Sequence, residues 1–221
     1  MQLQYCTFIP YVNERALLDQ ALHSIQALWP SVVVVDNSPL SEKGLTGLPV
    51  SVYRPPVPLT FSQTQNLFQQ IAYEKNADFF FFMHADAEAQ GEAAAKFVEY
   101  ASAQADKNWG LIYTHYDAFC CFNTKATRQV GYWDWRLFPW YYADCDYYLR
   151  IRRQGFEILQ SDLKVLHHNE GSNSMKHDPY LKQLNNWYME RTHIWYQYKW
   201  GGVPGREIFD VPFNGAFKEL L

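Results

Sequence analysis

Short apolar runs alternate with helical apolar repeats along the first half of the chain. The runs predict strands at 5–9, 32–35, 50–53, 79–83, 110–113 and 118–122. Between them, apolar residues recur with the period of a helix at 17–28, 62–72 and 93–105. The segments 32–35 and 79–82 are apolar at every position, which is typical of strands covered on both faces. This order predicts an α/β fold with a mostly parallel, doubly wound central sheet flanked by helices.

Polar residues mark where the predicted helices begin and end. Asn13 is placed to cap the first helix, and 29–30, Trp-Pro, is placed to end it. Ser62 with Gln65 fits a capping box for the second helix.

The second half of the chain has a different pattern. An aromatic segment at 131–142 has no clear period, and a helix is predicted from about Asp144 to 154 with Gly155 as its C-terminal cap. Strands are predicted at 156–159 and 164–166, and a helical C-terminal segment runs from 179 to about 199. No internal repeat or linker interrupts the pattern, so we expect one domain over 1–221.

The phenylalanine strand at 79–83 is followed at once by His84, Asp86 and Glu88. The valine strand at 32–35 is followed by Asp36. Ligands of open α/β sheets bind beyond the carboxyl ends of the strands, so these groups are candidates to hold a cation, a phosphate or a nucleotide. The alternative for each Asp is a turn or helix-cap role.

Composition argues against several classes of function and location. The formal charge of −4 argues against a nucleic-acid partner, which would select a basic surface. The four cysteines lack zinc-type spacing and are expected to be reduced. Neither a signal peptide nor a transmembrane segment is predicted, so we expect a cytoplasmic protein. The sequence leaves the oligomeric state open.

Three groups of polar residues could converge: His84 with Asp86 and Glu88, Asp144 with Asp146, and His167 with His168. Carboxylates suit Mg²⁺ and Mn²⁺, and Mn²⁺ also accepts imidazole. A cation that neutralises a leaving diphosphate, with a separate carboxylate as base, is the equipment for transfer from a nucleotide-activated donor.

The order and spacing of several short motifs match those of a known enzyme family. They are 8–10, Phe-Ile-Pro, with Asn13; 33–38, Val-Val-Val-Asp-Asn-Ser; Asn66; 84–86, His-Ala-Asp; 131–134, Gly-Tyr-Trp-Asp; 144–146, Asp-Cys-Asp; His167 with Gly171 and Ser172; and 199–205. Over nearly its whole length the chain resembles the family 2 glycosyltransferases, particularly their rhamnosyltransferase-like members. The resemblance implies the GT-A fold.

The resemblance also implies residue roles. Asp36 would contact the nucleotide base, Asp86 would bind Mn²⁺ or Mg²⁺ on the donor diphosphate, and Asp144 would be the general base of an inverting transfer, with Asp146 as the alternative. His167 or His168 would be a late metal ligand or a diphosphate contact. The full donor-binding set is Pro10, Asn13, Asp36, Asn66, His84, Ala85 and Asp86.

Two positions depart from the family pattern. His84 stands where the first acid of the metal motif is usual, and Ala143 replaces the usual Glu before the base. The implied donor is a UDP- or dTDP-linked sugar, and the implied acceptor is a hydroxyl of a glycan or glycoconjugate.

The aromatic segment is the candidate acceptor site, because ring faces stack on the C–H surfaces of sugars. Its candidate contacts are Trp133, Asp134, Trp140 and Tyr141. The alternative is a packed lid without a ligand.

Two other functions compete. A sugar nucleotidyltransferase should carry a glycine-rich basic loop after its first strand, and 10–15 holds one Arg and no Gly. A non-catalytic nucleotide-sugar or glycan-binding module would explain the altered metal motif.

Overall fold

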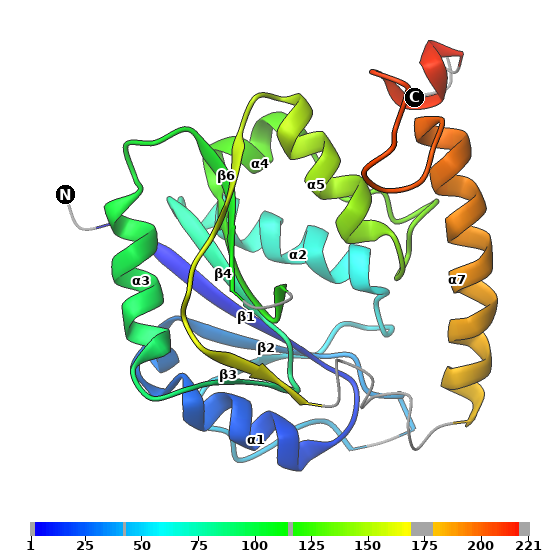
Figure 1. Ribbon diagram of the computed structural model, residues 1–221. Helices are drawn as coiled ribbons and strands as arrows, with labels where there is room; N and C mark the ends of the chain where they lie inside the picture. Colours follow the sequence, from blue (N-terminus) through cyan, green and yellow to red (C-terminus); the bar gives the residue numbers. More distant parts are fainter. Residues whose placement is uncertain (1–2, 42, 115–116, 169–178, 217–221) are drawn as a thin grey trace.

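A seven-stranded sheet forms the centre of the computed structural model, which describes residues 3–41, 43–114, 117–168 and 179–216 (Figure 1). Its strands are β1 (Tyr5–Tyr11), β2 (Val32–Asp36), β3 (Ser51–Tyr53), β4 (Phe79–Met83), β6 (Trp109–Tyr113), β7 (Phe119–Asn123) and β8 (Glu157–Gln160), in the order β3-β2-β1-β4-β7-β6-β8. All neighbouring strands run parallel except β7, which is antiparallel to both β4 and β6. The predicted mostly parallel α/β sheet is confirmed.

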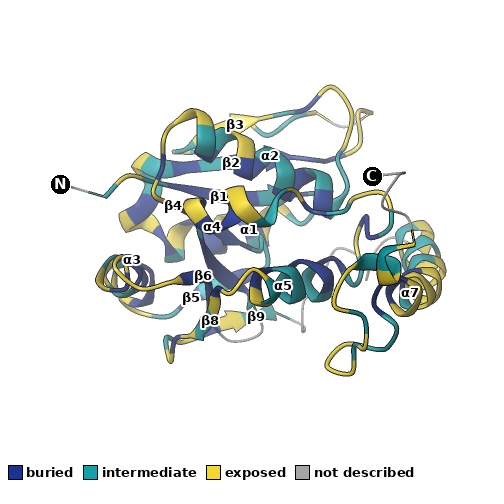
Figure 2. Ribbon diagram, turned by 90° about the horizontal axis from the view of Figure 1, so that it is seen from above, coloured by how far each residue is buried: buried dark blue, intermediate teal, exposed yellow. Residues whose placement is uncertain are grey.

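Helices cover both faces of this sheet (Figure 2). They are α1 (Arg15–Ser24), α2 (Phe61–Glu74), α3 (Ala93–Ala103), α4 (Thr124–Val130), α5 (Ala143–Arg153) and α7 (Pro179–Trp200), with short 3-10 segments at Gln26–Ser31 and Pro212–Gly215. None of the helices in the described ranges is long and apolar enough to cross a membrane.

The phenylalanine strand β4 divides its side chains between two cores. Phe79 and Phe81 pack with α1 and α3, whereas Phe80 and Phe82 pack with α2, α4 and α5. All four rings are buried, as the continuous apolar run predicts for a strand covered on both faces. β4 therefore lies at the centre of the sheet between β1 and β7.

A second, two-stranded sheet pairs segments that are far apart in the sequence. β5 (Ala87–Ala89) runs antiparallel to β9 (Val165–His167), with Ala87 opposite His167. The sequence predicted the second of these strands but not the first, which is only three residues long. This pairing joins the segment after β4 to the strand that ends in the two histidines.

The predicted helix boundaries need three corrections. The first helix ends at Ser24 and the chain continues as a 3-10 segment that contains Pro30. Asn13 does not cap it; the N-cap is Glu14, in the left-handed region with φ 63° and no side-chain hydrogen bond. The short helix α4 was not predicted.

The capping box of α2 lies two residues earlier than predicted. Thr60 accepts from the Gln63 backbone, and the Gln63 side chain accepts from the Thr60 backbone. The predicted cap, Ser62, is instead buried and donates from Oγ to the Phe138 carbonyl at 2.5 Å. The Ser62 hydroxyl, which the sequence pattern assigned to the helix cap, therefore makes a tertiary hydrogen bond instead.

The helix α7 lies at one side of the molecule and is attached through buried charges (Figures 1 and 2). Lys199 Nζ lies 2.8 Å from Asp146 Oδ1 and 2.6 Å from Asp134 Oδ2. Asp146 also accepts from Trp200 Nε1 at 2.9 Å and pairs with Arg150 Nε at 3.0 Å. Lys199 and Asp146 are both buried, so each charge depends on the other for compensation.

We expect Lys199→Met to lower the free energy of unfolding by about 3 kcal/mol, because it leaves Asp146 buried with less compensation. Urea denaturation followed by circular dichroism measures this. The control is Lys182→Met on the exposed side of the same helix, which should change stability by less than about 0.5 kcal/mol. Equal losses in the two variants would contradict the assignment.

Candidate functional site

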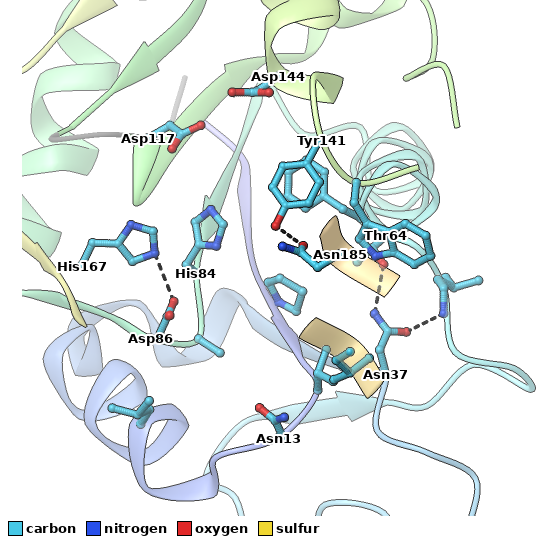
Figure 3. Close-up of a pocket in the computed structure, with 18 of the residues that line it drawn as sticks. Asn13, Asn37, Thr64, His84, Asp86, Asp117, Tyr141, Asp144, His167 and Asn185 are labelled. Atoms are coloured by element: carbon cyan, nitrogen blue, oxygen red, sulfur yellow. Dashed lines mark hydrogen bonds and ion pairs between the residues drawn. The ribbon is translucent and has the colours of Figure 1, made fainter. Parts of the chain in front are cut away.

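A cavity of about 1300 Å³ lies at the carboxyl edge of β1, β2 and β4 (Figure 3). Pro10 and Asn13 reach it from the end of β1, Asn37 from the residue after β2, and His84 with Asp86 from the turn after β4. This is the edge at which ligands bind in open α/β sheets. Residues at the ends of three neighbouring strands therefore share one cavity, and of the polar groups that the strand-end pattern named, His84 and Asp86 line it.

His84, Asp86 and His167 form a group that could hold a metal ion. One ligand atom from each lies within 4.8 Å of the others, and His167 Nε2 is 3.1 Å from Asp86 Oδ1. Figure 3 shows the three side chains together on one wall of the cavity. Two imidazoles and one carboxylate are a ligand set that Mn²⁺ accepts.

The electrostatic state of His84 suits a ligand. Burial and, to a lesser extent, the neighbouring His167 together lower its pKa to about 4, and the nearby Asp86 carboxylate only partly offsets this effect. The ring also stacks against Phe61, at 6.3 Å between centroids, and contacts Phe82 edge-on at 4.8 Å. His84 is therefore a neutral, fixed imidazole at pH 7, with a lone pair available for a cation.

The β5–β9 pairing explains why these side chains meet. After β4 the chain makes a tight turn in which the Ala87 amide donates to the His84 carbonyl at 3.1 Å. The His168 amide donates to the Asp86 carbonyl at 2.9 Å, which continues the two-stranded ladder. This backbone contact sets the side chains of Asp86 and His167 face to face. The group that could hold a metal ion is thus built by a contact between segments about eighty residues apart.

Two carboxylic acids line the cavity beside this group: Asp117 and Asp144. Burial and, to a lesser extent, the negative charge of Asp144 together raise the pKa of Asp117 to about 7, although a hydrogen bond from Tyr148 Oη to Oδ2 at 3.1 Å opposes the rise. Burial also raises the pKa of Asp144, against the lowering effect of backbone N–H groups at 144 and 145. Both acids are thereby made stronger bases than an exposed Asp.

Asp144, at which the sequence placed the start of this helix, is not the N-cap of α5. The N-cap is Tyr142, in the left-handed region with φ 59°, and Asp144 lies in the first helical turn. Asp117 also has a positive φ, 53°. Non-glycine residues in this region are strained, and such strain often accumulates at functional sites.

The sequence did not single out Asp117 or Tyr148. The available signal was an acid shortly after the strand at 110–113, on the same edge of the sheet as Asp86. It was weak because the antiparallel strand β7 follows directly, which the doubly wound pattern did not anticipate.

Besides His168 and Glu88, five of the sequence-based candidates lie outside the cavity lining. Asp146 is held by Arg150, Lys199 and Trp200 as described above. Asp36 is buried and accepts from the Ser38 hydroxyl at 2.5 Å and from the backbone of Ser38 and Leu45. Burial alone would raise the pKa of Asp36, but these hydrogen bonds outweigh it and hold the pKa below its usual value. Asp36 therefore fixes the loop after β2.

The other three outside the lining are Asn66, Trp133 and Asp134. The Asn66 side chain makes two hydrogen bonds to the Trp133 backbone, at 2.7 and 3.0 Å. Trp133 is buried and stacks on Tyr147 with 4.2 Å between ring centroids. Asp134 pairs with Lys199. These contacts hold the aromatic segment against α2 and α5.

The remaining candidates line the cavity, apart from His168. Pro10, Asn13, Ala85, Trp140 and Tyr141 all do so. His168 Nε2 lies 3.1 Å from Glu88 Oε2, away from the group of His84, Asp86 and His167. Gly171 and Ser172, which carried part of the resemblance, lie outside the described residues.

One polar contact of the lining comes from a residue that the sequence did not assign. Asn37 Nδ2 donates to Thr64 Oγ1 at 3.0 Å, and Asn37 Oδ1 accepts from the Leu59 amide at 3.1 Å (Figure 3). Asn37, rather than its neighbour Asp36, is the residue after β2 that reaches the cavity.

The charges of the lining are mostly negative. Glu14, Asp86, Asp117 and Asp144 contribute carboxyl groups, and Arg152 is the single lysine or arginine among the described residues of the lining. A polyanionic ligand would meet repulsion here unless a cation accompanied it.

The raised pKa of Asp117 makes stability depend on pH. The folded protein keeps its proton up to about pH 7, while the unfolded chain releases it near 3.8. Folding is therefore penalised increasingly as the pH rises from about 4 to 7. We expect Asp117→Asn to match the wild type near pH 4 and to gain roughly 2 kcal/mol of unfolding free energy at pH 8, after allowance for partial exposure of the carboxyl.

Denaturant titrations at several pH values measure this difference. The control is Asp162→Asn, because Asp162 is exposed and lies outside the cavity lining. A gain for Asp117→Asn that is the same at both pH values would show that the burial of its charge is not the cause.

Comparisons with known proteins support the architecture. No protein-family model and no curated protein sequence matches the chain. Among solved structures, similar ones include the mannosyltransferase PcManGT from Pyrobaculum calidifontis in complex with GDP-Man and Mn²⁺, with TM-score 0.56 and 13% identity over 73% of this chain and 55% of that one. Another is GalNAc-T7 with UDP, GalNAc and Mn²⁺, with TM-score 0.58 and 13% identity over 72% and 42%.

A third is residues 1–349 of S. aureus TarS, with TM-score 0.56 and 12% identity over 88% of this chain and 73% of that one. The chain spans about half the length of the first two structures. At this level of identity the likeness establishes the fold alone. The chain has the GT-A fold, as the sequence motifs implied.

Proposed function

We propose that the chain is an inverting glycosyltransferase that moves a sugar from a nucleotide-diphosphate donor to a hydroxyl of a glycan or glycoconjugate. The observation that carries this proposal is the meeting of two groups in one cavity. His84, Asp86 and His167 offer ligands for a cation, and Asp144 offers a base of raised pKa. Two solved structures with the same fold support it: the mannosyltransferase PcManGT is described in complex with GDP-Man and Mn²⁺, and GalNAc-T7 with UDP, GalNAc and Mn²⁺. The family 2, rhamnosyltransferase-like assignment remains part of this proposal.

The donor diphosphate would lie against His84, Asp86 and His167. The lining is acidic, so a cation is needed to balance the charge of a diphosphate. The bound cation would supply positive charge to the leaving diphosphate. Asp86 and His167 would hold it, and the neutral His84 would take the place of the usual acid. Two imidazoles favour Mn²⁺ over Mg²⁺.

The nucleotide would lie along the ends of β1 and β2. Pro10 and Asn13 line this part of the cavity together with Asn37, whose amide is held in place by Thr64 and Leu59. Asp36 would act through its neighbour by holding the loop, since its oxygens are occupied by Ser38 and Leu45.

Asp144 would take the proton from the acceptor hydroxyl. The acceptor oxygen attacks the anomeric carbon as the bond to the diphosphate breaks on the opposite face, which inverts the configuration. Burial raises the pKa of Asp144, so its carboxylate binds a proton more strongly than an exposed Asp would. Asp146 has no such freedom, because its two oxygens are engaged by Lys199, Trp200 and Arg150.

We expect hydrolysis and transfer from UDP-, GDP- or dTDP-sugars to require a divalent cation. EDTA should abolish both reactions, and Mn²⁺ should restore them better than Mg²⁺. His167→Gln should raise the Mn²⁺ concentration needed for half activity at least about tenfold. The matched control is His168→Gln, which should change it by less than about twofold because that ring pairs with Glu88. Full activity in EDTA would overturn the metal assignment.

Asp144→Asn should bind donor normally in calorimetry and lose transfer by about 10³-fold or more, because the base is absent. In the active enzyme, transfer should fall as the pH is lowered through the raised pKa of Asp144, since only the ionised form accepts a proton. Asp146→Asn should mainly lower stability. If Asp144→Asn stays active while folded Asp146→Asn is dead, the base assignment is wrong.

A non-catalytic binding module remains the competing function. A binding module would bind a nucleotide sugar or a glycan, but it would show no turnover with any cation or acceptor. Donor hydrolysis that depends on both Mn²⁺ and Asp144 would exclude it.

A further inference from the structure

One face of α7 forms a wall of the cavity. Leu181, Leu184, Asn185 and Tyr188 all line it, and their spacing of i, i+3, i+4 and i+7 places them on one side of the helix. Tyr141 Oη donates to Asn185 Oδ1, which joins this wall to the aromatic segment before α5 (Figure 3). The wall lies in the same cavity as Asp144.

An aromatic row leads from this wall to the outside of the molecule. Trp140 and Tyr188 line the cavity, and their ring centroids are 4.5 Å apart. The Tyr188 ring is in turn 4.9 Å from the ring of Trp187, its neighbour on the outer flank of the helix. The ring planes meet at 64° in the first pair and at 85° in the second, so the rings pack edge to face. We call Trp140, Tyr188 and Trp187 the aromatic row.

Two of the three side chains of the row are exposed, and Tyr188 is half-buried. Trp187 is 47% exposed and Trp140 is 38% exposed. Exposed clusters of this kind commonly mark binding surfaces. The aromatic row is continuous with the cavity, so a ligand bound on the row should extend into the cavity.

A hydrogen-bond donor, the guanidinium of Arg191, lies next to the rings. The guanidinium of Arg191 lies 3.9 Å from the centroid of the Trp187 ring, one helical turn further along α7. The row therefore pairs apolar ring surface with N–H groups that can donate to hydroxyl oxygens. A linear glycan presents the complementary chemistry, with C–H faces and hydroxyl edges that alternate along the chain.

From this arrangement we propose that the aromatic row binds an oligosaccharide acceptor. The sugar that receives the transfer lies at Asp144, and the second and third sugars stack on Trp140, Tyr188 and Trp187. The inference rests on the proposed function and specifies its acceptor as a glycan of at least three sugars. It assigns Trp187 and Arg191, which lie outside the cavity lining, to substrate recognition.

The experiment measures binding of the full chain to a printed array of linear oligosaccharides, from monosaccharides to hexasaccharides. Wild type is compared with Trp187→Ala and with Trp187→Phe, which keeps a ring. The matched control is Trp195→Ala on the same helix, because Trp195 is 46% exposed and its ring lies 6.3 Å from that of Tyr198, outside the cavity lining. Thermal midpoints confirm that each variant is folded.

We expect affinity to rise with length up to trisaccharides. Trp187→Ala should lower the affinity for trisaccharides and longer glycans about fivefold to tenfold, with monosaccharide binding unchanged. Trp187→Phe should retain most of the affinity, and Trp195→Ala should stay within about twofold of wild type.

Affinity that does not depend on length, or equal losses for Trp187→Ala and Trp195→Ala, would overturn the inference. So would the absence of binding to every glycan on the array. The proposed function is judged separately by Mn²⁺-dependent donor hydrolysis, which does not need the row. Hydrolysis without glycan binding would therefore reject the proposed role of the aromatic row and leave the proposed function standing. Length-dependent glycan binding without hydrolysis would reject the proposed function and leave the row as a glycan-binding surface.

Discussion

The pairing of β5 with β9 is the contact on which the rest of the site depends. It is short, with three residues on each strand, yet it brings His167 against Asp86 and closes one wall of the cavity. Without it, the turn after β4 would present a lone histidine and a lone acid, which is too little to hold a divalent cation. The backbone ladder places the second imidazole, and the buried β4 behind it supplies a rigid support.

Burial then sets the chemistry of the groups that this contact assembles. The same loss of solvent keeps the His84 imidazole neutral and raises the pKa values of Asp117 and Asp144. Desolvation disfavours the charged form of each group, so it acts in opposite directions on bases and acids. One cavity thus offers a neutral ligand on one side and basic carboxylates on the other.

Asp144 and Asp146 are two aspartates of one helix whose surroundings differ. They lie in the first turn of α5, two positions apart, and therefore point to different sides of the helix. Asp146 faces Lys199 and Trp200 and anchors α7, whereas Asp144 faces the cavity. The anchored helix in turn carries Asn185 and Tyr188 to the cavity wall.

The sequence by itself determined the sheet, its central phenylalanine strand, and the edge on which the polar groups gather, because side-chain periodicity and strand-end polarity are local properties. It also named His84, Asp86, Asp144 and His167 among the groups that could converge, and these four line one cavity. Tertiary structure decided the rest. It placed Asp36, Asn66, Trp133, Asp134 and Asp146 in structural contacts outside the cavity lining, brought Asn37 and Asp117 into that lining, and moved the predicted caps of two helices. An Asp or Asn has the same local pattern whether its partner is a ligand or a buried lysine, and the partner is fixed only when distant segments pack together.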